Sequence, residues 1–102
     1  MNIIKTSNLY NKLPKYKNAE NQIKAWVNDF TKNDYSTPNE IKAKYNSADF
    51  VGDNTVVFNI KGNDYRLIVR IRYQCKRVYF IWFGTHSEYD KLTDIENLKF
   101  ES

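Results

Sequence analysis

The chain has 102 residues, of which 41% are hydrophobic and 27% are charged. This length suits a single domain, residues 1–102, with one modest core, and the composition excludes a disordered chain. The sequence shows no signal-peptide run and no apolar stretch of the ~20 residues that a spanning helix needs, so we expect a cytoplasmic protein that does not enter the membrane. The single cysteine, Cys75, excludes an internal disulfide and cannot by itself form a thiolate metal site.

The basic residues are concentrated in one segment. The whole chain carries a formal net charge of +4. All four arginines lie within residues 66–77, and residues 61–77 carry a net +5 from Lys61, Arg66, Arg70, Arg72, Lys76 and Arg77 against Asp64. A mild overall excess is weak evidence for a polyanionic partner, but a concentrated excess predicts a basic surface patch.

The amino-terminal half has the apolar spacing of helices. Thr6 or Ser7 can cap a short first helix that is interrupted near Pro14. From Asn18, apolar side chains recur at steps of three and four residues, which predicts an amphipathic helix. The residues in this pattern are Ala19, Ile23, Trp26, Val27 and Phe30.

A third, shorter helix is predicted after the segment "NDYSTP", which ends the second one. Thr37 followed by Pro38 and Glu40 forms a capping box with proline at the first helical position. This helix should run to about Tyr45.

From Thr55 the hydrophobic period changes to the two-residue period of strands. Three segments rich in β-branched and aromatic residues follow, "TVVFNI", "YRLIVRIRY" and "RVYFIWF". They are separated by "KGND" and "QCK", which we interpret as hairpin connections of about two and three residues. The predicted fold is α+β, with N-terminal helices packed on one face of a small antiparallel β-meander and a short C-terminal helix.

The strand register follows by counting outward from the turns. A two-residue turn at 62–63 places Asn59 opposite Arg66. Because side chains alternate between faces, one face is apolar and carries Val56, Phe58, Ile60, Tyr65, Leu67, Val69 and Ile71. The other face carries Asn59, Lys61, Arg66, Ile68, Arg70 and Arg72. Counting around "QCK" places Arg66 beside Gly84, Ile68 opposite Trp82, Arg70 opposite Phe80 and Tyr73 opposite Arg77.

The only histidine lies at the start of a predicted helix, directly after the third strand. The residues "THSE" form a capping box with Thr85 at the N-cap, His86 at the first helical position and Tyr89 one turn further on. Free N–H groups there favour an anion such as phosphate. We expect the helix dipole and Arg66 to disfavour the imidazolium, so that a neutral His86 can accept a proton. The same cations are expected to lower the pKa of Tyr89, which could then act as acid or base.

Structural explanations compete with each functional one. A histidine at a helix start is often a polar surface residue, and a basic strand face is often only solvated. Trp82 and Tyr89 could serve packing rather than chemistry, and Glu88 is assigned to the cap. Cys75 is interpreted as a turn residue without a function. Residue types and spacing alone therefore leave a phosphodiester site as one alternative among several.

Two motifs resemble the HigB family of toxins from bacterial toxin-antitoxin pairs, within the RelE-like group of messenger RNA interferases. They are "VVFNIKGNDYRLIVRI" at 56–71 and "THSEYDKL" at 85–92, with looser similarity in "STPNEIKAKY". The resemblance spans nearly the whole chain. It implies a compact α+β domain that cleaves messenger RNA in the translating ribosome without a metal or cofactor. It also implies neutralisation by a helix-turn-helix antitoxin similar to HigA.

The resemblance implies a role for each candidate residue. Arg66 matches the strand arginine that stabilises phosphate in RelE-like enzymes. Asn59 and Lys61 fall in a strand where relatives carry lysines. His86 matches a position where some relatives have arginine and others histidine, and Tyr89 falls near a tyrosine used by part of the group.

We therefore predict a ribosome-dependent endoribonuclease toxin. His86 and Tyr89 are its expected acid–base pair, and Arg66 and Lys61 are expected on the scissile phosphate. Asn59, Arg70, Arg72 and Trp82 are the remaining expected substrate-binding residues, and no metal ligands are predicted. The alternative is a non-catalytic RNA-binding module that uses the same basic face, with Trp82 as a stacking surface. A third interpretation, a basic face exposed only to solvent, predicts no association with RNA.

Overall fold

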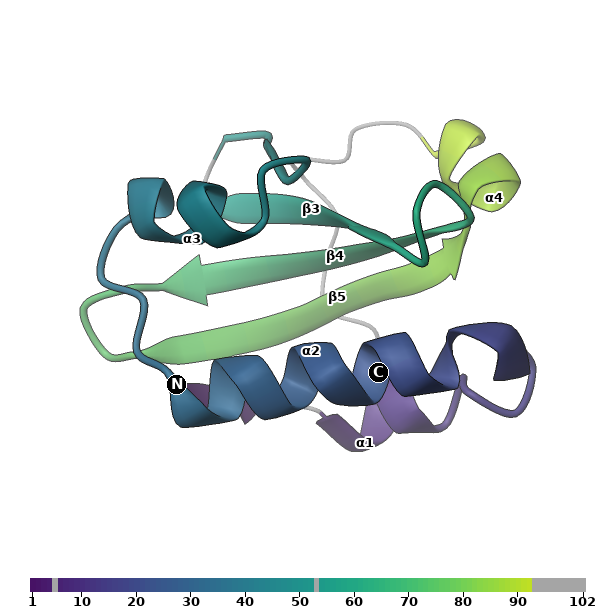
Figure 1. Ribbon diagram of the computed structural model, residues 1–102, viewed down its shortest axis with the longest axis horizontal. Coiled ribbons are helices and arrows are strands. Elements are labelled where there is room, and N and C mark those ends of the chain that lie inside the picture. The colour runs from purple at the N-terminus through teal and green to yellow at the C-terminus, as the bar shows by residue number, and fades with distance from the viewer. Residues whose placement is uncertain (5, 53, 93–102) are drawn as a thin grey trace.

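The computed structural model describes residues 1–4, 6–52 and 54–92 and shows helices packed against a five-stranded sheet (Figure 1). In chain order the elements are β1 (Asn2–Ile4), α1 (Thr6–Tyr10), the 3-10 helix η1 (Lys17–Ala19), α2 (Glu20–Lys32), α3 (Pro38–Lys44), β2 (Asp49–Phe50), β3 (Thr55–Ile60), β4 (Tyr65–Arg72), β5 (Arg77–Thr85) and α4 (His86–Asp90). The α+β prediction, with a short helix after the last strand, is confirmed.

The sheet is wider than predicted. Strands β3, β4 and β5 form the expected antiparallel meander. β2 adds an antiparallel pair beside β3, and β1 pairs with β5 in parallel. The sheet is therefore mixed, in the order β1-β5-β4-β3-β2, and not purely antiparallel. β1 and β2 have only three and two residues, too few for a two-residue hydrophobic period to be recognised in the sequence.

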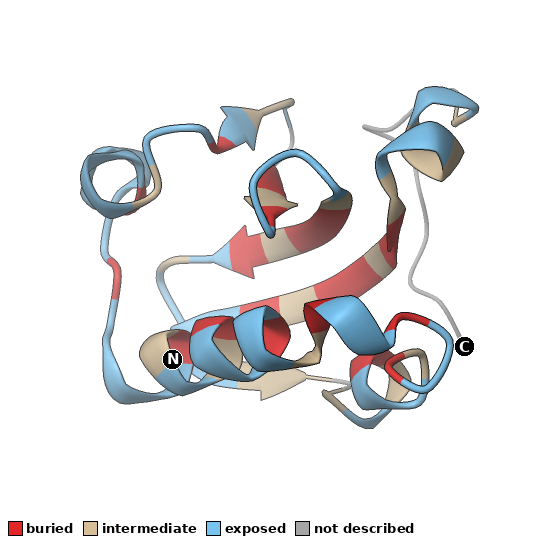
Figure 2. Cartoon of the chain, turned by 45° about the vertical axis from the view of Figure 1, so that its right-hand side comes forward, coloured by how far each residue is buried: buried red, intermediate tan, exposed pale blue. Residues whose placement is uncertain are grey.

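The main core lies between α1, α2 and one face of the sheet. From α2, the ring of Trp26 stacks on Phe30 with centroids 4.5 Å apart and meets Phe58 of β3 edge-on at 5.5 Å. The predicted apolar sheet face is confirmed, because Val56, Phe58, Ile60, Leu67, Val69 and Ile71 are buried and Tyr65 is partly buried in this cluster. Figure 2 shows buried residues where α2 faces the strands.

The predicted register of β3 and β4 is confirmed, including Asn59 opposite Arg66 and Thr55 opposite Arg70. The register of β4 and β5 is correct only near α4, where Arg66 pairs with Gly84 and Ile68 with Trp82. The predicted pairs of Arg70 with Phe80 and of Tyr73 with Arg77 are wrong. The structure pairs Arg70 with Tyr79 and Arg72 with Arg77.

A β-bulge explains this difference. The register shifts between Ile68 and Val69, which pair with Trp82 and Phe80, so Ile81 is the extra residue in β5. The bulge interrupts the alternation of faces and lets Phe80 and Phe83 both reach the main core. The connection from β4 to β5 is correspondingly one residue longer than predicted, spanning 73–76.

The outer face of the sheet also has a small apolar cluster. Val57, Ile68 and Ile81 are buried there, with exposed fractions of 2% or less. Partly buried side chains pack against them, among them Trp82 of β5 and Tyr89 of α4. The alternation of residues predicted Ile68 on this face, but it did not predict the buried cluster that Ile68 forms with Val57 and Ile81.

Asp29 connects the end of α2 to the segments that follow it. Its carboxylate, only 11% exposed, forms an ion pair with Lys44 and accepts hydrogen bonds from the hydroxyl groups of Tyr35 at 2.7 Å and Tyr45 at 2.6 Å. Burial raises the pKa of Asp29, but the hydrogen bonds from Lys44, Tyr45 and Tyr35 outweigh it, and the pKa lies below its ordinary value. Burial and Asp29 both raise the pKa of each tyrosine.

Asp29→Asn is expected to lower the free energy of unfolding by about 1–3 kcal/mol at pH 7, because charge-assisted hydrogen bonds are lost in a mostly buried place. The folded pKa of Asp29 lies below the unfolded value of ~3.9. The carboxylate therefore stabilises the fold above about pH 4, and this contribution disappears as the pH falls through the folded pKa.

Urea unfolding of both proteins from pH 7 to pH 2 measures this effect. The difference between parent and Asp29→Asn should shrink on the acid side. Glu20→Gln is a matched control, because it removes a carboxylate from the exposed ion pair with Lys24 and should change stability by less than about 0.5 kcal/mol. A constant Asp29→Asn difference across the pH range would contradict the assignment.

No helix within the described residues combines the length and the apolar composition needed to cross a membrane.

Candidate active site

One end of the outer sheet face carries a row of three residues from three strands. Asn59 of β3 pairs with Arg66 of β4, which pairs with Gly84 of β5. β5 continues directly into α4, and the backbone N–H of His86 donates to the carbonyl of Asp64 in the β3–β4 turn at 2.9 Å. The strand register and this bond bring residues 59–66 and 84–89 to one place, as counting predicted.

Arg66 is the buried cation of this site, with 8% of its surface exposed. Its Nη1 donates to the carbonyls of Asn63 and Tyr65, both at 3.1 Å, and its Nη2 donates to Oδ1 of Asn63 at 3.3 Å. These bonds fix the guanidinium beneath the β3–β4 turn. A guanidinium has five N–H donors, so at most two remain for a ligand if each N–H makes one bond.

Arg66 also contacts Tyr89, with its Cζ 5.8 Å from the centre of the phenol ring. The pKa of Tyr89 lies above its ordinary value, because burial and the charges of Asp49 and Asp90 raise it more than Arg66 lowers it. The expectation that nearby cations would lower this pKa was therefore wrong. It omitted Asp49, which lies in β2, a strand that the sequence did not reveal.

The cap of α4 has the predicted geometry. The hydroxyl oxygen of Thr85 accepts the N–H of Glu88 at 3.1 Å, and Oε1 of Glu88 accepts the N–H of Thr85 at 2.9 Å. The same oxygen also accepts a hydrogen bond from the Tyr16 hydroxyl at 2.8 Å, which joins α4 to the helical half of the chain. The backbone N–H of Thr85 and the Tyr16 hydroxyl lower the pKa of Glu88, against a smaller upward effect of burial. The bond from Tyr16 could not be read from the sequence.

Gly84 allows Trp82 to lie close to the backbone. A Cβ at Gly84 would stand 2.6 Å from Cη2 of the Trp82 indole and 2.9 Å from Oε1 of Glu88, so no larger residue fits without movement. The Trp82 ring packs against the outer apolar cluster and lies 6.4 Å from the ring of Tyr89. The Trp82 ring therefore contributes to packing. The requirement for glycine at position 84 was not predicted from the sequence.

His86 is the exposed member of the site, with 48% of its side chain accessible. Its Nε2 lies 3.3 Å from Oδ2 of Asp90, one turn along α4, and the two form an ion pair whenever the imidazole is protonated. The spacing of four residues on a helix favours this contact. The carboxylate of Asp90 therefore lies directly beside Nε2 of His86.

Of the other predicted residues, Lys61 belongs to this end of the sheet, whereas Arg70 and Arg72 do not. Lys61 is exposed in the β3–β4 turn, where its backbone has a positive φ of 53°. Arg70 and Arg72 lie towards the opposite end of β4 and line a separate cavity. Among the described residues, no group of three His, Cys, Asp or Glu side chains is placed to hold a metal ion.

This arrangement supports proton transfer next to a bound anion. A fixed guanidinium can hold a phosphate, an exposed imidazole can exchange protons with a substrate, and a phenol with a raised pKa keeps its proton at neutral pH and can donate it. The imidazole of His86 and the phenol of Tyr89 are both carried by α4, so their position relative to Arg66 depends on α4 remaining packed on β4 and β5.

Thr85→Ala tests the cap of α4. It removes the acceptor for the Glu88 N–H and should lower the free energy of unfolding by roughly 1 kcal/mol, with faster amide hydrogen exchange in residues 86–90. Thr85→Ser keeps the hydroxyl and is the matched control, which should retain most of the stability. Equal losses for the two variants would show that the methyl group, and not the cap, is what matters.

Comparison with known proteins gives matches to one protein family. Residues 19–92 match the HigB toxin family, the RelE-like toxic component of a toxin-antitoxin system. The chain is 28% identical over 101 residues to the mRNA interferase toxin HigB of Escherichia coli strain K12. Proteins named mRNA interferase HigB from Escherichia coli O157:H7 and Shigella flexneri match to the same extent. Each match covers 97% of this chain and 97% of the relative.

Proposed function

The chain belongs to the HigB family of RelE-like toxins, and we propose that it is a ribosome-dependent endoribonuclease that cleaves translated messenger RNA without a metal ion. Membership of the family makes it the toxic component of a toxin-antitoxin pair, and the curated relatives carry the name mRNA interferase. The observation that carries the proposal is the contact of buried Arg66 with Tyr89 at the foot of the helix that begins with His86. Action on ribosomes would place the protein in the cytoplasm.

In the proposed reaction the ribose 2′-hydroxyl attacks the adjacent phosphate. His86 accepts the hydroxyl proton, a new bond forms between the 2′-oxygen and phosphorus, and the bond to the 5′-oxygen breaks. Tyr89 gives its proton to that leaving oxygen, and the products are a 2′,3′-cyclic phosphate and a 5′-hydroxyl. The raised pKa of Tyr89 supports the assignment of Tyr89 as acid and His86 as base.

Arg66 and Lys61 are proposed to stabilise the charge that develops on the phosphate. The two remaining N–H donors of Arg66 suffice for one bidentate contact. Asn59 is proposed to orient the substrate beside Arg66, since the two are paired across β3 and β4. Arg70, Arg72 and Trp82 are proposed to bind the flanking RNA.

The ribosome is proposed to supply part of the alignment of the 2′-hydroxyl. His86 and Asp90 are exposed at the edge of the site, so the bound message would have to be positioned by something outside this chain. The cognate antitoxin is proposed to be a helix-turn-helix protein of the HigA type. It would inhibit by covering the basic face or, less favoured, by moving α4 away from Arg66.

A non-catalytic RNA-binding module would use the same face. The packing of Trp82 over Gly84 leaves less of its ring for a base, which weakens the stacking role that this alternative assigns to Trp82. The two functions differ in the outcome of substitution at His86.

His86→Gln should reduce cleavage of messenger RNA on programmed ribosomes by ~10² or more, because it removes the group that accepts the proton. Thermal unfolding should change little, since the imidazole is exposed. Ser87→Ala, at the next exposed position of α4, controls for local disturbance and should cleave at nearly the parent rate. Cleavage by His86→Gln at the parent rate would contradict the proposed role of His86 as the general base. Absence of cleavage by the parent protein would favour the binding module.

Arg66→Lys should also reduce cleavage strongly although the charge is kept, because an ammonium cannot reproduce the bidentate guanidinium. The variant also loses hydrogen bonds to Asn63 and Tyr65, so unfolding must be measured alongside, with an expected loss of about 1–3 kcal/mol. Asn63→Ala separates the two effects, because it removes one acceptor and leaves the guanidinium in place. If Asn63→Ala lost as much cleavage as Arg66→Lys, Arg66 would be acting through the turn and not on phosphate.

A further inference from the structure

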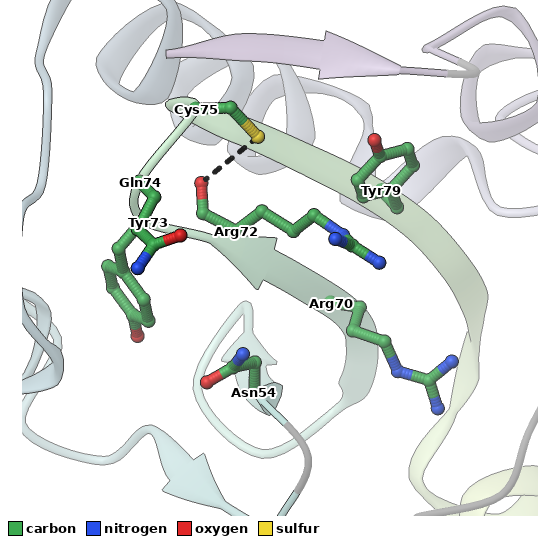
Figure 3. Close-up of a pocket in the computed structure, with 7 residues that line it drawn as sticks. All are labelled: Asn54, Arg70, Arg72, Tyr73, Gln74, Cys75 and Tyr79. Atoms are coloured by element: carbon green, nitrogen blue, oxygen red, sulfur yellow. Dashed lines mark hydrogen bonds between the residues drawn. The ribbon is translucent and has the colours of Figure 1, made fainter.

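A cavity of about 710 Å³ opens on the outer sheet face at the end remote from α4 (Figure 3). Four kinds of side chain line it: the arginines Arg70 and Arg72, the tyrosines Tyr73 and Tyr79, the amides Asn54 and Gln74, and the thiol of Cys75. They come from the end of β4, the β4–β5 connection, the start of β5 and the loop before β3. Its size lies within the range of cavities that hold small molecules and cofactors.

The charge of this cavity favours an anion. The residues that line it include two guanidinium groups and no carboxylate. Arg70 is oriented by a hydrogen bond from its Nε to the hydroxyl of Thr55 at 3.1 Å. Arg72 is exposed at the end of β4, and Lys76 and Arg77 follow it in the chain. A single guanidinium can bind a phosphate through two parallel N–H···O hydrogen bonds.

The remaining lining residues favour a nucleotide over a bare anion. A tyrosine ring offers a face on which a base can stack, and Asn and Gln side chains carry both a donor and an acceptor that match the edge of a base. Figure 3 shows Arg72 extending toward Tyr79 of β5, with Arg70 on the same strand and Asn54 on the loop at the other side of β4. An acidic protein segment would use the arginines but would leave the rings and amides without a specific partner.

We propose that this cavity is a second nucleotide-binding site, which holds one unstacked nucleotide of single-stranded RNA away from the point of cleavage. The phosphate binds Arg70 and Arg72, the base stacks on a tyrosine ring, and the amides of Asn54 and Gln74 contact the base edge. The inference rests on the proposed function in taking RNA as the ligand.

The position of the cavity on β4 determines how many nucleotides separate it from the scissile phosphate. Arg66 and Arg72 lie at opposite ends of β4, about 20 Å apart at ~3.3 Å per residue. A stacked strand advances ~3.4 Å per nucleotide. The second site therefore lies within roughly six nucleotides of the scissile phosphate.

Backbone NMR of the whole protein locates the binding directly. The probe is a 2′-O-methyl RNA tetranucleotide, which lacks the attacking hydroxyl and so cannot be cut. Amide shifts should appear at Asn54, Arg72 and Gln74. Arg72→Gln should weaken binding about tenfold, the scale of one charge-assisted contact. Lys32→Gln, which removes one positive charge at the end of α2, should change affinity less than about twofold.

Three results would overturn the second site. They are shifts confined to residues 84–92, equal weakening by Arg72→Gln and Lys32→Gln, or the same shifts at equal concentration of a hexaglutamate peptide, which would assign the cavity to an acidic protein segment. Ribosomal cleavage by the parent protein is measured separately. If the RNA does not bind in the cavity but the parent protein cleaves messenger RNA, only the second site is overturned. If the RNA shifts amides in the cavity but the parent protein does not cleave, only the proposed function is overturned.

Discussion

The carboxylate of Glu88 holds the candidate site together. One of its oxygens closes the cap of α4 through the N–H of Thr85 and also accepts the hydroxyl of Tyr16. Tyr16 is itself buried edge-on against the rings of Tyr65 and Phe83. A helix of five residues is not stable on its own in water, so the position of His86 depends on this junction. The site is thus fixed by the main core, although α4 itself has no buried residue.

Arg66, the cation proposed to bind the phosphate, is fixed in place by the folded structure. A buried charge must be paired or hydrogen-bonded. Here the oxygens of Asn63 and Tyr65, which are neutral, accept three hydrogen bonds from the guanidinium. The guanidinium consequently needs no rearrangement when an anion arrives, which is what electrostatic stabilisation of a transition state requires. The same bonds use up more than half of its donors, so the direction from which a phosphate can approach is narrow.

The parts of the fold that were predictable are those set by local chemistry. The "KGND" turn fixed the pairing of Asn59 with Arg66, and the "THSE" box fixed the start of α4. The connection around "QCK" has a positive φ at Lys76, where a glycine would have indicated the turn, so the register between this connection and the bulge was predicted wrongly. The effect of Asp49 on the pKa of Tyr89 and the hydrogen bond from Tyr16 to Glu88 depend on tertiary packing, and no spacing in the sequence encodes them.

The bulge at Ile81 also decides what the outer face can bind. By turning Ile81 onto that face it completes the apolar cluster with Val57 and Ile68. Ile68 lies between Arg66 and Arg70 on the same side of β4, so the cluster separates the two basic ends of the strand. Because Val57, Ile68 and Ile81 are 2% exposed or less, a flexible polyanion crossing the face would meet guanidinium groups at each end and, between them, the partly buried rings of Trp82 and Tyr89 that pack against the cluster. Phosphates are therefore favoured at the two ends, and the flat apolar faces of bases are favoured in the middle, which is the arrangement that a single strand can adopt and a stiff duplex cannot.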